Sequence, residues 1–141
     1  MKSMNDRYFI DSNILVYAND RSSPDKQRRA KAIIKDALTS RAACLSTQVL
    51  QEFFVVATRK ASLPPSNARA QILVFSDLDT VIIDAQLVIS AIDCHIIHHI
   101  SFWDALIIKS AAAAGCQRLL TENLNHGQVI DGVKIENPFL H

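Results

Sequence analysis

The chain has 141 residues, of which 49% are hydrophobic and 21% charged, with only 3 glycines and 4 prolines. This length suits a single domain over residues 1–141, and the composition excludes a disordered chain, a collagen-like repeat and a small disulfide-held fold. The net charge of +1 hides a separation, because residues 1–60 carry 11 basic and 6 acidic side chains, whereas residues 61–141 carry 4 and 8.

Short apolar runs alternate with helical patterns along the whole chain. In chain order the sequence predicts strands at 8–10, 42–45, 80–83, 118–121 and 133–136. The helices predicted between them lie at 12–18, 25–41, 46–60, 65–75, 85–99 and 101–115. Because parallel strands need crossover connections, this alternation predicts an α/β fold with a parallel sheet and helices on both faces.

The cysteines and the N-terminal segment indicate the compartment. Cys44, Cys94 and Cys116 are far apart in the sequence and lack the spacing of a zinc or redox motif, which is typical of reduced thiols in the cytosol. The first apolar stretch is too short and too acidic for a signal peptide. Charges interrupt every apolar run before the roughly 18 residues of a membrane span. We therefore expect a cytoplasmic protein with no membrane contact.

Asp11 directly follows the first predicted strand. Ligand sites of open α/β sheets lie beyond the carboxyl ends of the strands, so this position favours a functional carboxylate. Asp is also a favoured helix N-cap, which is the structural alternative. Ser12 and Asn13 are available for capping, and we expect them to take that role.

Glu52 interrupts the apolar side of a predicted helix. At about 100° per residue, it falls between Val55 and Val56 on the helical wheel. An ionised carboxylate at such an angle needs a cation or a proton. The alternative partner is Arg59, seven residues further along the same helix.

Two further candidate acids lie later in the chain. Asp104 stands three residues after Ser101, which is the spacing of a capping-box variant, but a helix N-terminus also keeps a carboxylate ionised. Glu122 follows the fourth strand in a segment with several amides, for which a polar turn is the alternative. Carboxylates gathered at one sheet edge repel one another unless a hard cation such as Mg²⁺ or Mn²⁺ neutralises them.

Four segments of the chain resemble, in order and spacing, the PIN domain family and within it the VapC-like toxins of toxin–antitoxin pairs. These segments are FIDSNIL at 9–15, STQVLQEF at 46–53, FWDALI at 102–107 and LLTENL at 119–124. The resemblance covers the chain from residue 9 to about 139. It implies a three-layer α/β/α sandwich with a mostly parallel sheet of 4–5 strands.

The resemblance also implies an activity and a set of site residues. It implies a Mg²⁺- or Mn²⁺-dependent endoribonuclease, inhibited by a small antitoxin protein and assembled as a homodimer. Carried over position by position, Asp11, Glu52 and Asp104 are the catalytic and metal-binding acids. Asn13 is expected beside Asp11, and Thr47 near the metal pocket.

The fourth acidic position of the family is occupied differently in this chain. Asn123 stands there, two residues after the Thr that ends the fourth strand, and Glu122 lies one residue earlier. This departure favours an alternative, a weakened or inactive PIN-like module that binds RNA or protein. A third hypothesis is phosphotransfer with Asp11 as the nucleophile. It is weakened because Asn13 stands where such an enzyme carries a second Asp.

Two further patterns have both functional and structural interpretations. His95, His98 and His99 have the helical spacing of zinc ligands, although a solvated histidine cluster is the alternative. The basic side chains within residues 25–35 could contact RNA phosphates or acidic antitoxin residues, or form a solvated helix face.

Overall fold

The computed structural model describes residues 6–140, and this part of the chain forms strands and helices in near-regular alternation. The strands are β1 (Tyr8–Ile10), β2 (Ala43–Ser46), β3 (Asp79–Val81), β4 (Arg118–Leu120), β5 (Val129–Ile130) and β6 (Val133–Glu136). The helices are α1 (Ser12–Tyr17), α2 (Pro24–Ser40), α3 (Thr47–Lys60), α4 (Pro65–Phe75), α5 (Ala85–His98) and α6 (Phe102–Ala113).

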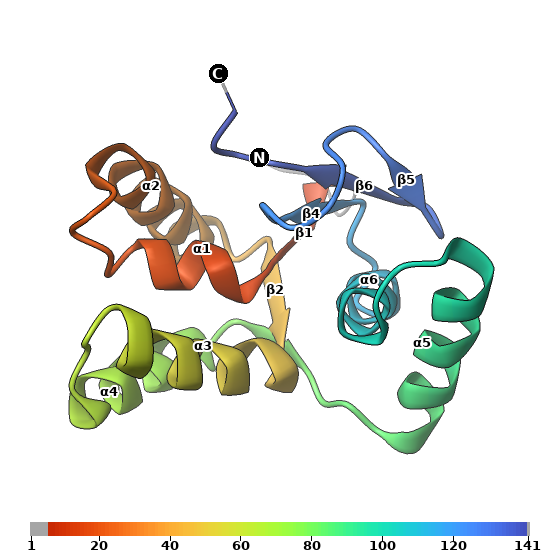
Figure 1. Cartoon of the computed structure of the whole chain (residues 1–141), viewed down its shortest axis with the longest axis horizontal. Helices are drawn as coiled ribbons and strands as arrows, with labels where there is room; N and C mark the ends of the chain where they lie inside the picture. Colours follow the sequence, from red (N-terminus) through yellow and green to blue (C-terminus); the bar gives the residue numbers. More distant parts are fainter. Residues whose placement is uncertain (1–5, 141) are drawn as a thin grey trace.

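The strands form one six-stranded sheet in the order β3-β2-β1-β4-β6-β5. All neighbours pair in parallel except β5 and β6, which form an antiparallel hairpin. Figure 1 shows α1 to α4 on one side of the sheet and α5 with α6 on the other. The predicted three-layer α/β/α sandwich is thus confirmed. The expected count of 4–5 strands missed β5, because its two residues, Val129 and Ile130, are too few to show the periodicity of a strand.

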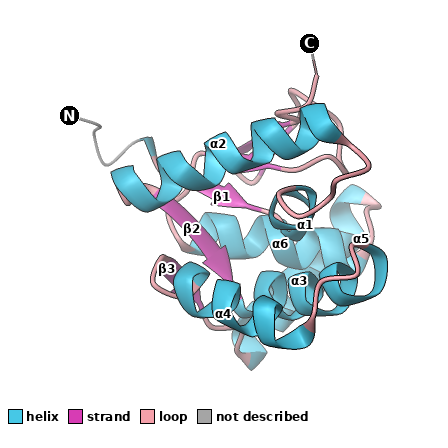
Figure 2. Cartoon of the chain, turned by 90° about the vertical axis from the view of Figure 1, so that its left-hand side faces the viewer, coloured by secondary structure: helices cyan, strands magenta, loops and turns pink. Residues whose placement is uncertain are grey.

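The centre of the sheet is buried on both faces. All three residues of β1 are buried, and Phe9 lies opposite Cys44 on β2 and Leu119 on β4. Figure 2 shows α6 behind β1 and β2, with α2 on the near side. Continuous apolar strands are what a parallel sheet between two helical layers requires. No helix of residues 6–140 is both long and apolar enough to span a membrane.

Side-chain caps fix where α1, α3 and α6 begin. Ser46 caps α3 by accepting from the Val49 backbone N–H, and Ser101 caps α6 by accepting from the Asp104 N–H. The prediction that Ser12 and Asn13 cap α1 is wrong, because the cap is Asp11, whose carboxylate accepts from the Ser12 N–H. Ser12 and Asn13 are instead the first helical residues. Their side chains are therefore free to make other contacts.

Candidate active site

Asp11 is the most deeply placed of the candidate acids. It is 3% exposed, directly beyond β1, and its Oδ1 accepts from the Ser12 N–H at 2.7 Å. Its Oδ2 accepts from the Thr121 hydroxyl at 2.8 Å and from the Asn13 amide at 3.4 Å. Burial raises the pKa of Asp11, the charge of Asp104 adds to this rise, and the bonds from Thr121 and Ser12 oppose it. All these donors are uncharged, so they orient the carboxylate without neutralising it.

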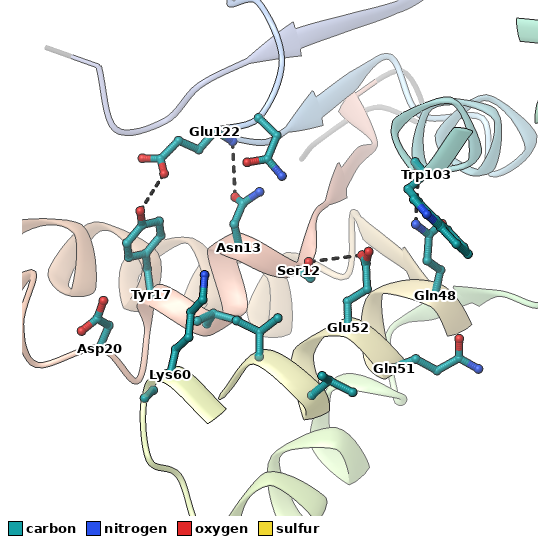
Figure 3. Close-up of a pocket in the computed structure, with 15 residues that line it drawn as sticks. Ser12, Asn13, Tyr17, Asp20, Gln48, Gln51, Glu52, Lys60, Trp103 and Glu122 are labelled. Carbon is teal, nitrogen blue, oxygen red and sulfur yellow. Dashed lines mark hydrogen bonds between the residues drawn. The ribbon is translucent and has the colours of Figure 1, made fainter. Parts of the chain in front are cut away.

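Glu52 lies on α3, the helix that follows β2, and β2 is the neighbour of β1 in the sheet. Its side chain reaches the same Ser12 that binds Asp11. The Ser12 hydroxyl donates to its Oε1 at 3.3 Å, as Figure 3 shows. Burial raises the pKa of Glu52, and the charges of Asp11 and Asp104 raise it further. The alternative partner Arg59 forms none of the ion pairs described for residues 6–140. The apolar-face position of Glu52 therefore serves a shared acidic site.

Asp104 lies in the first turn of α6. Its backbone N–H donates to the Ser101 hydroxyl at 3.0 Å, which is one half of the predicted capping box. Its carboxylate makes none of the hydrogen bonds found within residues 6–140, so it is not committed to the cap. Its charge reaches both Asp11 and Glu52, since it raises the pKa of each. The structure thus brings together the three predicted acids from α3, α6 and the end of β1.

The donor set around these acids fits a hard divalent cation. Within residues 6–140, no Lys, Arg or His side chain forms an ion pair with Asp11, Glu52 or Asp104. One turn before Glu52, Gln48 is 4% exposed and donates from Nε2 to the Trp103 carbonyl at 3.2 Å. Its Oε1 is buried without a hydrogen-bond partner. Carboxylates and an unsatisfied amide oxygen are the ligands that Mg²⁺ and Mn²⁺ prefer, whereas a buried acceptor left alone is costly.

A cavity of about 700 Å³ opens beside the acids. Its walls include Ser12, Asn13, Gln48, Glu52 and Trp103, and Figure 3 shows the Lys60 side chain directed into it from the end of α3. A volume of this order accommodates a ligand of nucleotide size. The cavity therefore joins an acidic inner wall to a cationic side chain at its outer part.

Glu122 lines the cavity but is held away from the acid cluster. Its Oε1 accepts from the Tyr17 hydroxyl at 2.6 Å and its Oε2 from the Lys26 ammonium at 2.5 Å. Burial acts to raise the pKa of Glu122, but the hydrogen bonds from Lys26 and Tyr17 outweigh it and lower the pKa below its usual value. Its backbone N–H donates to the Asn13 Oδ1 at 3.3 Å. The charge of Glu122 is thus already neutralised within the chain.

The two remaining predicted positions differ in their relation to the cavity. Asn123 lines it, and its backbone N–H donates to the Thr121 hydroxyl at 3.1 Å. Thr47 is not among the lining residues, and its hydroxyl accepts from the Ile83 N–H at 3.4 Å. The structure therefore places Asn123 at the site and turns Thr47 toward the segment after β3.

Several side chains that shape this site were not predicted as site residues from the sequence. Thr121 and Ser12 bind the acids directly, and Gln48 borders them. A signal for Gln48 was present, since residues four apart share a helix face and Gln48 precedes Glu52 by four. For Thr121 the signal was its place directly after a strand, which is also the place of Asp11.

A family model matches most of the chain. The PIN domain model matches residues 8–130. The chain belongs to the PIN domain family. Among curated proteins no sequence matches this PIN domain.

Solved structures share the fold of this PIN domain at low sequence identity. VapC20 of Mycobacterium tuberculosis, a Sarcin-Ricin loop cleaving toxin, superposes with a TM-score of 0.60 at 18% identity, over 79% of this chain and 86% of that one. DNA-bound VapBC of Salmonella typhimurium superposes with a TM-score of 0.66 at 19% identity, over 94% of this chain and 98% of that one. VapBC2 of Rickettsia felis, bound to a fragment of its promoter DNA, superposes with a TM-score of 0.64 at 22% identity, over 92% of this chain and 97% of that one.

Proposed function

We propose that this PIN domain is a metal-dependent endoribonuclease that hydrolyses RNA phosphodiester bonds and is the toxin of a toxin–antitoxin pair. The observation that carries the proposal is the convergence of Asp11, Glu52 and Asp104 beside the cavity, where no basic side chain of residues 6–140 forms an ion pair with them. Such a cluster selects a divalent cation and, through it, a phosphate group. The likeness to VapC20, a Sarcin-Ricin loop cleaving toxin, supports the substrate class.

The residues divide the work of the reaction among them. Asp11 and Asp104 would hold a Mg²⁺ or Mn²⁺ ion, and Glu52 would complete the pocket and position the attacking water. When bound, the ion supplies a Lewis acid for the scissile phosphate and lowers the pKa of water. Thr121 and the Ser12 N–H fix the Asp11 carboxylate, and the Ser12 hydroxyl fixes Glu52. Lys60, which lines the cavity, would contact an RNA phosphate, and no nucleophilic side chain is required.

The cavity wall opposite the acids favours a single resident ion. Asn123 contributes an amide without charge, and Glu122 is paired with Lys26. Neither side chain therefore offers an unpaired negative charge to bind a second cation. The alternative function, a weakened or inactive module that binds RNA or protein, is favoured by these same residues.

The expected partners of the toxin are an antitoxin and a second copy of the chain. The VapBC complexes among the similar structures support a small antitoxin protein. Exposed isoleucines along α5, Ile89, Ile92 and Ile96, support a further protein contact such as a homodimer. We place the pair in the cytoplasm.

The test is cleavage of labelled RNA by the purified protein with Mg²⁺ or Mn²⁺, against an EDTA control. Asp11→Asn should abolish the cleavage, whereas Asp93→Asn, which alters an exposed acid of α5 that does not line the cavity, should preserve it. RNA that is bound but never cut under any metal condition would favour the inactive module. Undiminished cleavage by Asp11→Asn would contradict the proposed site.

A further inference from the structure

A second group of metal-ligating side chains lies apart from the acid cluster. Cys94 and His98 are on α5, and Asp131 is in the turn between β5 and β6. One potential ligand atom from each lies within 4.8 Å of the others. None of the three lines the cavity beside Asp11. We propose that they form a separate transition-metal site, best suited to Zn²⁺.

The backbone brings these residues together from distant parts of the chain. Cys94 and His98 are four residues apart on α5 and therefore share one helix face. Asp131 and Gly132 form the two-residue connection of the β5–β6 hairpin, with φ of 51° and 79°. Two positive φ values are typical of the tight turn that matches the twist of a hairpin. The turn thus holds the Asp131 side chain at a fixed place against α5.

The ligand types distinguish this site from the acid cluster. A thiolate, an imidazole and a carboxylate are Zn²⁺ ligands, whereas an all-oxygen set suits Mg²⁺ and Mn²⁺. The charges of the Cys94 thiolate and the Asp131 carboxylate together balance a divalent ion. Cys94 is buried, while His98 and Asp131 are exposed, so an ion can enter from solvent and a fourth ligand can be water.

Of the two interpretations of His95, His98 and His99, a zinc site made by these three side chains together is not what the structure forms. The His95 Nδ1 is hydrogen-bonded to the Ile100 carbonyl, and His99 is the C-cap of α5 with φ of 57°. Neither belongs to the ligand group, which His98 forms with Cys94 and Asp131 instead. The helical spacing was a valid signal, but the partner of His98 one turn earlier is a cysteine.

Lys109 of α6 competes with the ion for the same carboxylate. Its Nζ lies 3.2 Å from the Asp131 Oδ2, which leaves Oδ1 for a metal. The ammonium neutralises Asp131 in the metal-free protein and repels an incoming cation. Replacing Lys109 by an uncharged residue should therefore strengthen metal binding. A merely structural ion pair would predict no such gain.

Cobalt is the probe that separates the two metal sites. Co²⁺ bound through a thiolate gives a charge-transfer absorption in the near ultraviolet, which Co²⁺ held by carboxylates alone does not give. We expect this band in the wild-type protein and in Asp11→Asn, where the nuclease site is disabled. Addition of Zn²⁺ should bleach the band, and Lys109→Met should shift its titration to lower Co²⁺ concentration.

Matched variants decide which residues bind the ion. Cys94→Ser, His98→Ala and Asp131→Asn should each lose or strongly weaken the band, whereas His95→Ala should retain it. Asn tolerates positive φ, so Asp131→Asn keeps the turn, and exposed His98 can be replaced without opening the core. A band that persists in Cys94→Ser, or a wild-type protein that gives none at saturating Co²⁺, would overturn the proposal. Failure of RNA cleavage with an intact band would concern the nuclease function alone.

Discussion

Two acidic regions border the same cavity, and the structure treats them in opposite ways. Glu52 lines the inner wall, and beside it the buried Asp11 receives hydrogen bonds from Ser12, Asn13 and Thr121, all uncharged, and burial raises the pKa of Asp11. On the opposite wall, Glu122 receives the Lys26 ammonium, and its pKa is lowered. The first region retains an unbalanced charge, whereas the second is neutralised within the chain.

The difference shows which acid is available for an external cation. Lys26 also lies 4.7 Å from the centre of the Tyr17 ring, so the Glu122 region joins α1, α2 and the segment after β4 into one network. Such a network stabilises the wall of a site. The burial of Asp11 and Glu52, together with their repulsion by each other and by Asp104, instead lowers the stability of the metal-free protein, and a bound cation would relieve this cost.

The largest expected effect comes from Asp11→Asn. Loss of the charge that holds the ion should reduce RNA cleavage by roughly a thousandfold, equivalent to about 4 kcal/mol of barrier. The same variant should melt at a higher temperature than the wild type in EDTA, because a buried unbalanced charge is removed. Parallel cleavage and thermal-unfolding measurements check both. A lower melting temperature would show that Asp11 acts mainly as the cap of α1.

Addition of divalent cation should distinguish the two regions through stability. An ion present at 100 times its Kd stabilises the folded state by about 2.7 kcal/mol. We expect Mg²⁺ or Mn²⁺ to raise the melting temperature of the wild type and of Glu122→Gln, but not of Asp11→Asn. An equal rise in Asp11→Asn would place the ion elsewhere.

Glu122→Gln should affect stability more than chemistry. The Lys26 and Glu122 side chains are 39% and 27% exposed, so solvent screens the ion pair and its loss should cost at most about 1 kcal/mol. The cleavage rate per folded molecule should stay close to that of the wild type. Chemical denaturation and RNA cleavage measure the two quantities. A loss of cleavage as large as that of Asp11→Asn would indicate that Glu122 is a metal ligand, and would contradict the difference between the two acidic regions.

Gln48→Met tests the unsatisfied amide oxygen at the inner wall. It removes the hydrogen bond to the Trp103 carbonyl, worth about 1 kcal/mol net, and the free Oε1. Cleavage should then need a higher Mg²⁺ concentration and recover when Mg²⁺ is saturating. A defect that saturating metal does not repair would show that Gln48 acts by positioning Glu52 and α6 rather than by binding the ion.

The bounds of elements with strong local signals could be predicted from the sequence alone. The strand Tyr8–Ile10 and the helix Pro65–Phe75 have their predicted bounds, because an apolar run ends at a charge and a proline pair opens the helix. Helical geometry also separates Thr47 from Gln48, since they lie about 140° and 40° from Glu52 around the axis. The prediction for Thr47 rested on motif resemblance and did not use this angle.

Long-range pairing was the part that no local pattern contained. The partners of Glu122 lie 96 and 105 residues away, on α2 and α1, so nothing near Glu122 indicates that its charge is neutralised. The cap of α1 is a similar case. Asp11 both caps the helix and joins the acid cluster, and the two hypotheses for this residue were not exclusive.

The smallest expected effect concerns Asn123, on the boundary between the two regions. Asn123 is exposed and lines the cavity, and its contact with Thr121 is made by the backbone, so Asn123→Asp keeps that bond and adds one charge. The new carboxylate would extend the unbalanced region toward the neutralised one. We expect a modest increase in metal affinity and in cleavage at low Mn²⁺, with no change at saturating Mn²⁺. Metal titrations of cleavage for this variant and Asn123→Ala measure it. A large gain in rate at saturating Mn²⁺ would contradict this prediction. It would mean that the wild-type rate is limited by the lack of a second ion, and that the side chain at position 123 belongs to the metal-binding region.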